Sequence, residues 1–496
     1  MTGLTAESVL KGFRQAKARR KNWETLWGQC YDFALPQHDG ALTAQSSGRS
    51  SGQGRVDRLF DATASDAVDQ LAASLMAELT PPWSRWFELA PGVDMDDDER
   101  AGMEPALDRT SAVLQAHFDR SNLGLEIHQA YLDLVTVGSA TLLFEEAPLG
   151  EPSAFRFTAV PVGQIALEEG ESGRLDTTYR ATELTKAQLG ARFPDAKLPD
   201  HKGREGDDAL HTVIEAVVPD ETGTRQYAAV LSEGGDEGRL LATGEFDRSP
   251  FINFRWTKAP GEVYGRSPVM KALPDIKTAN KVVELVLKNA TIAVSGIWQA
   301  DDDGVLNPAT VKLTPGTIIP KAVGSKGLTA LEAPGRFDVS QLVLQDLRGR
   351  IRHALLADRL GQINNPKMTA TEVLERSAEI SKLLGATYGR LQSELLNPLV
   401  ERGVAILRRR GEIEDMILDG RRVELRYRSP LAKNQRRQDA QDALLWFDTV
   451  GKIGPEALSI IDAPKAARWL AQAFNVPDDL LKTEPADAGA GVGDVR

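Results

Sequence analysis

Cysteine is almost absent from this sequence, which has one cysteine, Cys30, among 496 residues. A single thiol excludes a disulfide framework within the chain and a zinc site built from cysteines. The six histidines show no metal-ligand spacing either. The sequence therefore predicts no metal and no other cofactor, and its composition suits the reducing cytoplasm.

Long apolar runs are also absent. No stretch of 18 apolar residues occurs, because the best candidate, residues 130–144, is too short and contains Asp133. The N-terminus has basic residues but no apolar core or small-residue cleavage site of a secretory signal. We therefore expect neither a membrane span nor a leader.

Enzyme motifs are missing or out of context. Residues 324–326, Gly-Ser-Lys, are only a fragment of a phosphate-binding loop. The run Gly48-Arg49-Ser50-Ser51-Gly52 matches the G-x-S-x-G nucleophile elbow, but it lies in a polar, low-complexity stretch without the strand and helix that an elbow needs. The prediction is that the chain is not an enzyme, with a serine hydrolase based on Ser50 kept as an alternative.

Positive charge is in short supply, with 59 Lys and Arg against 71 Asp and Glu and a net charge of −12. Tight binding of nucleic acid through the general surface needs cations that neutralise phosphates, so this balance argues against it. It does not exclude a protein through which DNA passes. The acidic clusters at residues 94–99 and 301–303 lack the spacing of a calcium loop and are interpreted as solvated loop ends.

One stretch, residues 261–295, stands out for its helical pattern. Ser267 can cap a helix and Pro268 can take its first position. Residues 275–295 contain no Gly or Pro, which allows about 31 Å of helix. Apolar residues follow the 3.6-residue period, and a separate stripe about 60° wide carries Lys277, Lys281, Glu284 and Lys288.

A second long helix is predicted for residues 339–360, after a polar insert with small β signals at residues 310–320. Arg348, Arg352 and Arg359 fall within about 40° of one another on it. A loop of residues 361–368 follows, carrying Asn364, Asn365 and Lys367, and leads to a third long helix, kinked at Pro398 and ended by Gly411. For one helix such a stripe is ordinarily a solvated face, and two matching stripes change that interpretation only modestly.

The rest of the chain reads as α+β and predominantly helical. Helices are expected at residues 5–35, 57–79, 103–120 and 125–137, an antiparallel β-rich module at 155–254, a strand at 423–430 that can return to this module, and three short helices up to residue 481. Residues 37–55 read as a surface loop.

Four blocks, in this order and spacing, resemble the portal, or head-to-tail connector, proteins of short-tailed bacteriophages. They are DATASDAVDQLAASLMAELTPPWSRWFEL, GEVYGRSPVMKALPDIKTANKV, TATEVLERSAEISKLLGATYGRLQSELLNPLVERGVAIL and VELRYRSPLAKNQRRQD. The resemblance covers nearly the whole chain, and none of the blocks is catalytic.

This resemblance implies a portal fold assembled as a homo-oligomeric ring, commonly of twelve subunits. The implied parts are N-terminal helices and an α/β wing (1–262), stem helices (263–295 and 339–360), a clip (296–338), a channel loop (361–368), a long kinked helix with a wing return strand (369–430), a helical crown (431–482) and a disordered tail (483–496).

The implied function is a conduit for double-stranded DNA in packaging and ejection. The implied location is the portal vertex of the virion, after assembly in the cytoplasm of the bacterial host. The implied partners are the major capsid protein, scaffolding protein, the large terminase and tail adaptor or tail tube proteins, without membrane insertion. A non-catalytic tail adaptor or scaffold protein remains the alternative from the same virion.

The sequence leaves the roles of the basic positions open between the DNA channel and the subunit interface. These candidates are Lys277, Lys281, Lys288, Arg348, Arg352, Arg359, Asn364, Asn365 and Lys367.

Overall fold

The chain divides into two compact units. The computed structural model describes residues 4–38, 58–82, 84–92, 94–196, 210–221, 223–234, 237–295, 298–300, 323, 328–330, 337–360, 385, 387–414, 422–427, 430–453, 461 and 463–473. The first unit comprises Met1–Ala72, His128–Leu143 and Thr158–Gly361, and the second comprises Ala73–Ile127, Phe144–Phe157 and Gln362–Arg496. Helices predominate over antiparallel strands, which confirms the predicted α+β class.

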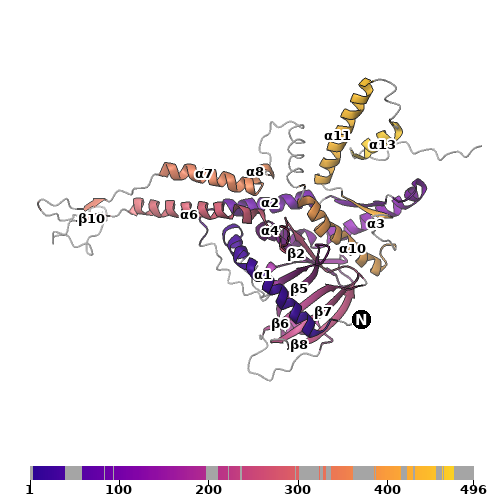
Figure 1. The fold of residues 1–496 in the computed structure, drawn as a ribbon, viewed down its shortest axis with the longest axis horizontal. Coiled ribbons are helices and arrows are strands. Elements are labelled where there is room, and N and C mark those ends of the chain that lie inside the picture. The colour runs from indigo at the N-terminus through magenta and orange to yellow at the C-terminus, as the bar shows by residue number, and fades with distance from the viewer. Residues whose placement is uncertain are drawn as a thin grey trace, which may run out of the picture. The chain divides into compact units, whose positions relative to one another are not determined.

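A five-stranded antiparallel sheet forms the β-rich part of the first unit (Figure 1). Its strands follow one another in the order of the chain: β4 (Ile165–Glu169), β5 (Leu175–Thr185), β6 (Leu210–Pro219), β7 (Arg225–Gly234) and β8 (Glu237–Phe246). Neighbouring strands of such a meander can be joined by short turns, but residues 186–209, which include a short helix, connect β5 to β6. The antiparallel strands predicted for residues 155–254 are therefore present, but only residues 165–246 form this sheet, and the strands at residues 155–160 and 251–255 belong to a second, three-stranded sheet.

Helix α1 (Ala6–Ala34) covers one face of this sheet. Phe13 and its apolar neighbours on α1 pack against buried side chains such as Tyr179 and Ile214. Buried Arg20 donates hydrogen bonds to the carbonyl oxygens of Gly163 (2.8 Å) and Ile165 (2.7 Å). On the other face, a smaller cluster forms around the short helix α5 (Lys186–Arg192).

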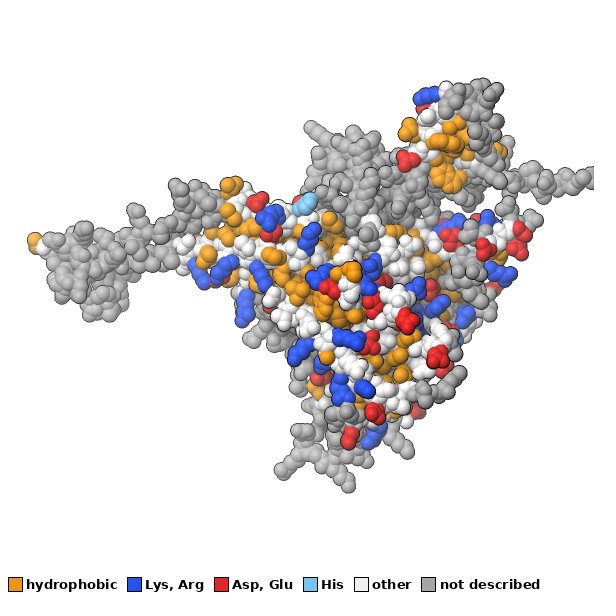
Figure 2. Space-filling model, viewed as in Figure 1, with side chains coloured by type: hydrophobic (Ala, Val, Ile, Leu, Met, Phe, Trp, Pro, Cys, Tyr) orange, Lys and Arg blue, Asp and Glu red, His pale blue; other side chains and the backbone are white. Residues whose placement is uncertain are grey.

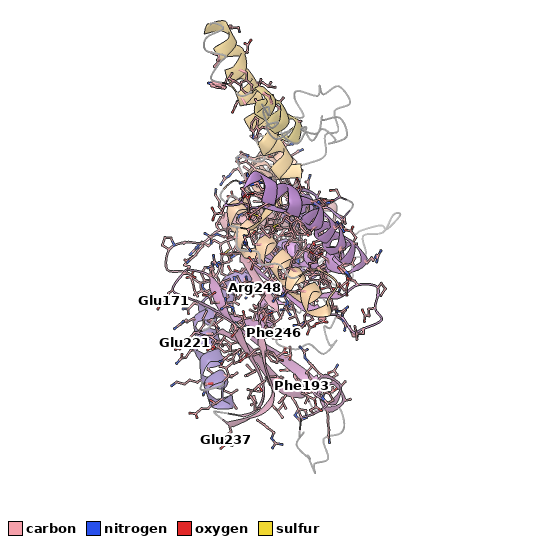
Figure 3. All side chains as sticks on the ribbon, turned by 90° about the vertical axis from the view of Figure 1, so that its right-hand side faces the viewer. Glu171, Phe193, Glu221, Glu237, Phe246 and Arg248 are labelled. Atoms are coloured by element: carbon pink, nitrogen blue, oxygen red, sulfur yellow. The ribbon has the colours of Figure 1, made fainter. Side chains whose placement is uncertain are left out.

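Exposed acidic residues stand at three turns of the sheet: Glu171 between β4 and β5, Glu221 between β6 and β7, and Glu237 at the start of β8 (Figure 3). Because these carboxylates are solvated, they bring no cost of burying a charge, and they contribute to the negative net charge of the chain. The acidic composition is thus visible on this module as a surface property.

Two backbones pass very close together where strand β2 (Ser139–Glu146) and helix α6 (Pro268–Ser295) begin. Gly138 has a φ of +79°, and a Cβ placed on it would lie 2.6 Å from the carbonyl oxygen of Gly265. A Cβ on Gly265 would in turn collide with the carbonyl oxygen of Gly138. Both glycines are therefore required at this crossing.

Hydrogen bonds tie the same crossing together. The Gly265 N–H donates to Ser139 Oγ (2.8 Å), and the Trp256 N–H donates to the carbonyl oxygen of Gly138 (2.9 Å). Trp256 directly follows β9 (Phe251–Arg255), which pairs with β2 in antiparallel register. The start of α6 is thus fixed to a sheet strand.

Helix starts differ from the predicted ones because of local capping. Helix α2 (Thr63–Leu79) begins later than expected, since the Asp61 carboxylate accepts the Thr63 N–H (3.0 Å) just ahead of it. Helix α3 (Asp97–Arg120) begins earlier than the expected Met103, because the Asp96 carboxylate caps the Glu99 N–H (2.8 Å). The Asp-rich stretch that was interpreted as a loop end is thus the start of a helix. Helix α4 (Leu123–Val137) lies where a helix was predicted.

An aromatic core fills the second unit. The ring centroids of Phe144 and Phe157 are 4.3 Å apart, and those of Phe118 and Phe155 are 5.0 Å apart. Such tilted pairs add to the free energy gained from burial alone. The core joins α3 to β2 and to strand β3 (Phe155–Val160) through residues that belong to this unit.

Strand β12 (Val423–Tyr427) lies at the predicted position but has a different partner. It pairs with β1 (Phe87–Pro91) in antiparallel register, Leu89 opposite Leu425, and not with the five-stranded sheet. The backbone of buried β1 needs a partner for its hydrogen bonds, and β12 supplies it. The predicted return to the β-rich module is therefore wrong.

The C-terminal part of the second unit is helical as predicted. Helix α10 (Asn397–Arg410) follows a π-helical turn at Gln392–Leu396 and ends at Gly411, which has a φ of +71°. The next helix, α11 (Pro430–Ile453), is one long helix where short ones were predicted, and α13 (Ala463–Ala473) follows it. Within the described parts of the chain, no helix has the length and apolar character of a bilayer span.

The crossing of Gly138 and Gly265 predicts opposite effects for two glycine substitutions. We expect Gly265→Ala to lower the free energy of unfolding by about 3 kcal/mol, because the new methyl group meets a backbone carbonyl that cannot move aside. Gly349→Ala, in helix α7 (Phe337–Ala354) with no atom within 4 Å of the added Cβ, should raise it by about 0.5–1 kcal/mol. Urea unfolding at one protein concentration measures both, and equal effects would contradict this account.

Candidate functional site

The candidate site is the helical hairpin of α6 and α7, and its first helix starts as predicted. The Ser267 hydroxyl accepts the Met270 N–H (2.9 Å) and donates to the carbonyl oxygen of Thr136 (2.8 Å). Pro268 takes the first helical position, where a missing N–H costs nothing. The 28 residues of α6 span about 42 Å.

The two helices of the hairpin lie side by side (Figure 1). Their buried apolar residues include Ile276 and Ala279 on α6 and Leu344, Leu347 and Ile351 on α7. An ion pair joins the helices, with 2.7 Å between Arg350 and the carboxylate of Asp275. At the far end two short strands, β10 (Trp298–Ala300) and β11 (Leu328–Ala330), pair in antiparallel register, while the β signal predicted at residues 310–320 lies outside the described residues.

The second helix is shorter than predicted. Helix α7 ends at Ala354, and Leu356, with a φ of +58°, separates it from the four-residue helix α8 (Ala357–Leu360). Leu355 is fully buried beside this break, so packing favours the bend over continued helix. The continuous helix over residues 339–360 is therefore a wrong prediction, and Arg359 does not share the helical stripe of Arg348 and Arg352.

Arg348, whose side chain is 40% exposed, belongs to a partly buried junction that joins both helices to the chain ahead of α2. Its guanidinium donates to Asp61 Oδ2 at 2.8 Å. Asn280 on α6 accepts the N–H groups of Phe60 (2.6 Å) and Asp61 (3.1 Å) and donates to the carbonyl oxygen of Arg58 (3.0 Å). The side chain of Asn280 therefore satisfies three backbone groups of one short segment.

The charge of Asp61 depends on this junction. Burial alone would raise the pKa of this carboxyl, which is only 5% exposed, but hydrogen bonds from Thr63 and Arg348 outweigh it and lower the pKa below its usual value. The sequence did not point to Asp61 as the partner of Arg348, nor to Asn280 as the residue that holds the segment containing Asp61. The Asp-x-Thr pattern at residues 61–63, ahead of the apolar helix, is the capping signal that marks Asp61.

Lys277 also contacts its own chain. Its ammonium donates to Gln29 Oε1 (2.7 Å) and lies 5.9 Å from the ring centroid of Phe33, both on α1. The half-buried Lys277 thus links α6 to α1. It is set apart from Lys281 and Lys288, with which it shares a stripe in the sequence.

Lys281 and Lys288 are exposed and share one anion. Both donate to Glu284, at 2.9 Å and 2.6 Å, as helix spacings of three and four residues allow. Hydrogen bonds from Lys288 and Lys281 lower the pKa of Glu284, so this carboxylate stays charged. The three side chains together carry one net positive charge.

The other candidates are placed as follows. Arg352 is exposed near the end of α7, and Arg359 lies in α8. Asn364, Asn365 and Lys367 lie outside the described residues, as does most of the predicted clip.

Apolar side chains remain exposed on the hairpin. Leu285 (49%) and Leu287 (50%) on α6 and Leu342 (70%) and Val343 (43%) on α7 are large residues that the described chain does not cover. Figure 2 shows orange hydrophobic atoms next to blue Lys and Arg side chains along the hairpin. Clustered apolar residues on a surface mark sites of protein contact.

Reactive groups give no support to an enzyme among the described residues. Burial raises the pKa of the Cys30 thiol to about 12, so this cysteine is no nucleophile at neutral pH. The described side chains hold no group of three or more His, Cys, Asp and Glu placed for a metal ion. The motif around Ser50 lies outside the described residues.

Comparison with known proteins defines the class. The model of the family "Bacteriophage head to tail connecting protein" matches residues 6–481. The chain therefore belongs to the family of bacteriophage head-to-tail connecting proteins, which confirms the resemblance found in the sequence. Portal proteins act at the junction of head and tail as the conduit of the phage genome, and this is the function of the chain.

Individual relatives are portal proteins of several phages. The chain is 26% identical to a probable portal protein of Bordetella phage BPP-1 over 95% of this chain and 88% of the relative. It is 27% identical to the portal protein of Salmonella phage epsilon15 (93% and 86%) and 21% identical to that of Escherichia phage T7 (80% and 74%). The neck of a native gene transfer agent particle, computed with C12 symmetry, aligns with a TM-score of 0.37 and 13% identity over 88% of this chain and 97% of the other.

The Asp61 junction predicts a specific role for Arg348. Arg348→Gln leaves a buried carboxylate without its cation, and we expect the free energy of unfolding to fall by about 1–3 kcal/mol. Arg352→Gln, at an exposed position of the same helix, should change it by less than about 0.5 kcal/mol. Urea unfolding at pH 7 and one protein concentration compares the two, and similar values would contradict the role of the junction.

The same junction sets an acid dependence. Because the folded-state pKa of Asp61 is lowered, its stabilisation is present above the ordinary value of 3.8 and is lost as the pH falls below it through the folded-state pKa. The wild type should therefore lose more stability below that value than Arg348→Gln does. Equal losses in the two proteins would show that Asp61 does not depend on Arg348.

Proposed function

We propose that copies of this chain close into a ring in which the α6–α7 hairpins surround the path of double-stranded DNA. The observation that carries this proposal is the set of large apolar residues left exposed on the hairpin, Leu285, Leu287, Leu342 and Val343. The hairpin already packs its own interior, so these residues favour contact with a second copy. When one face of a subunit binds a different face of an identical neighbour, the contact repeats from subunit to subunit. The subunits form a closed ring if the successive rotations add up to a full turn.

Twelve subunits is the expected number for a portal of this family. In the ring the stem corresponds to α6 and α7, and the polar insert of residues 296–338 forms the clip. The five-stranded sheet with the N-terminal helices forms the wing (residues 1–262), residues 361–368 form the channel loop, residues 369–430 hold the long helix and β12, and residues 431–482 form the crown. Residues 483–496 are a tail.

The basic candidates divide into two roles under this proposal. Lys277 and Arg348, which contact Gln29 and Asp61 of the same chain, position the stem helices. Lys281 and Lys288, with Arg352 and Arg359, face DNA or a neighbouring subunit, and so do Asn364, Asn365 and Lys367. Glu284 halves the net charge of its lysine pair, which suits a conduit because strong phosphate contacts would hold the duplex in place.

The proposed partners follow from the place of a portal in the virion. During assembly in the host cytoplasm the ring contacts scaffolding protein and the major capsid protein. The clip binds the large terminase during packaging and tail adaptor or tail tube proteins afterwards. Only DNA passes through the ring, and the chain itself acts as a structural component without catalytic activity.

A pair of charge substitutions tests the ring. The double variant Leu285→Glu, Leu287→Glu places charges at both exposed leucines of α6, and we expect the population of closed rings to fall at least about tenfold, since each buried unpaired charge costs several kcal/mol. Native mass spectrometry and negative-stain images measure ring and monomer.

The matched control is Leu149→Glu, an equally drastic change at a residue that is 88% exposed outside the hairpin. It should leave the rings intact. Intact rings in the double variant, or loss of rings in Leu149→Glu alone, would overturn the proposed interface.

A further inference from the structure

The turn that ends α1 carries a histidine directed at α4. Leu35 caps α1 and is buried, and the His38 N–H donates to the carbonyl oxygen of Leu35 (3.2 Å). The His38 Nδ1 lies 3.5 Å from Asp133 Oδ1 on α4. The His38 side chain therefore joins the turn of residues 35–38 to α4.

Asp133 is a buried carboxylate whose charge needs a partner. It is 7% exposed, and the Tyr31 hydroxyl donates to its Oδ1 at 2.9 Å. A hydroxyl is neutral, so it satisfies a hydrogen bond without balancing the charge. Burying an ion is costly unless an opposite charge lies close, and protonated His38 supplies this charge.

The other groups around His38 favour its charged form as well. Gln129 on α4 hydrogen-bonds to the imidazole, and Asp69 on α2 adds a second negative charge. Asp69 in turn interacts with His128 on α4 and with Asp66 on its own helix. The charged groups acting on His38, Asp133 and Asp69, are thus both carboxylates.

The direction of the histidine's pKa agrees with this geometry. Burial alone would lower the pKa of His38, but the hydrogen bonds and charges of Asp133, Gln129 and Asp69 outweigh burial and raise it above 6.5. A raised folded-state value means that the contact stabilises the protein fully below the unfolded value of about 6.5. This stabilisation is lost as the pH rises through the folded-state value.

We propose that His38 and Asp133 form a proton-operated latch that fastens the turn of residues 35–38 to α4 at mildly acidic pH and releases it as the pH rises. Leu35 is buried independently of this contact, so α1 keeps its place and the change is confined to the end of the turn at His38. All partners of the latch belong to one subunit. The latch therefore works whether or not the ring has closed, and it is independent of the proposed channel.

Hydrogen exchange tests the latch on the full-length protein. The amides of Gln37 and His38, at the end of the turn, are compared at pH 5.5 and 8.5 after correction for the intrinsic rate, and the α1 amides of residues 31–34 serve as an internal reference that should not change. We expect protection of the two turn amides in the wild type to fall by about threefold or more, because deprotonation of His38 removes its ion pair with Asp133. His38→Gln keeps a hydrogen-bonding side chain without the charge and should show low protection at both pH values. His353→Gln, at an exposed position of α7, is the matched control and should keep the fall.

A second readout titrates the imidazole directly. Exchange of the His38 C2–H, followed by mass spectrometry, should give a midpoint above 6.5 in the wild type and a lower midpoint in Asp133→Asn. A wild-type midpoint at or below 6.5 would overturn the latch. A His38→Gln protein that retains the pH-dependent fall would overturn it too, even if Asp133→Asn does not fold.

Discussion

The hairpin depends on one crossing of two backbones. Gly138 and Gly265 pass each other where a side chain on either would meet the other's carbonyl group, and the N–H of Gly265 is held by Ser139. This crossing sets where α6 begins. The cap at Ser267, the junction of Asp61 with Arg348, and the contact of α6 with α7 all build on that starting point.

Charge in this protein is arranged to limit attraction to DNA. The chain carries a net charge of −12. Most of the described Lys and Arg side chains on the hairpin form hydrogen bonds or ion pairs within the same chain. Arg348 balances a buried carboxylate, and Lys281 and Lys288 share Glu284. Because phosphate binding strengthens with each cation that is free to neutralise it, such pairing keeps a conduit from retaining its cargo. Family membership and electrostatics therefore point to the same function.

Features that depend on neighbouring residues in the sequence were predicted better than features that depend on residues far apart in the sequence. The start of α6 followed from Ser267 and Pro268 because caps act within one turn of helix. The break at Leu356 gave no such signal, since it depends on the burial of its neighbour. The sequence also did not show which charged residues contact each other. Asp61 and Arg348 are 287 residues apart, and only the fold brings them together. The basic stripes were visible in the sequence. The sequence did not show which of these basic side chains form contacts within their own chain.

The most direct test of the account is a cryo-electron microscopy map of the purified assembly. The account predicts a closed ring whose central opening is surrounded by α6 and α7, with Leu285 and Leu342 in contact with a neighbouring subunit and Lys281 and Lys288 facing the opening or that neighbour. A ring in which the hairpins point outward into solvent, with these leucines uncovered, would contradict it.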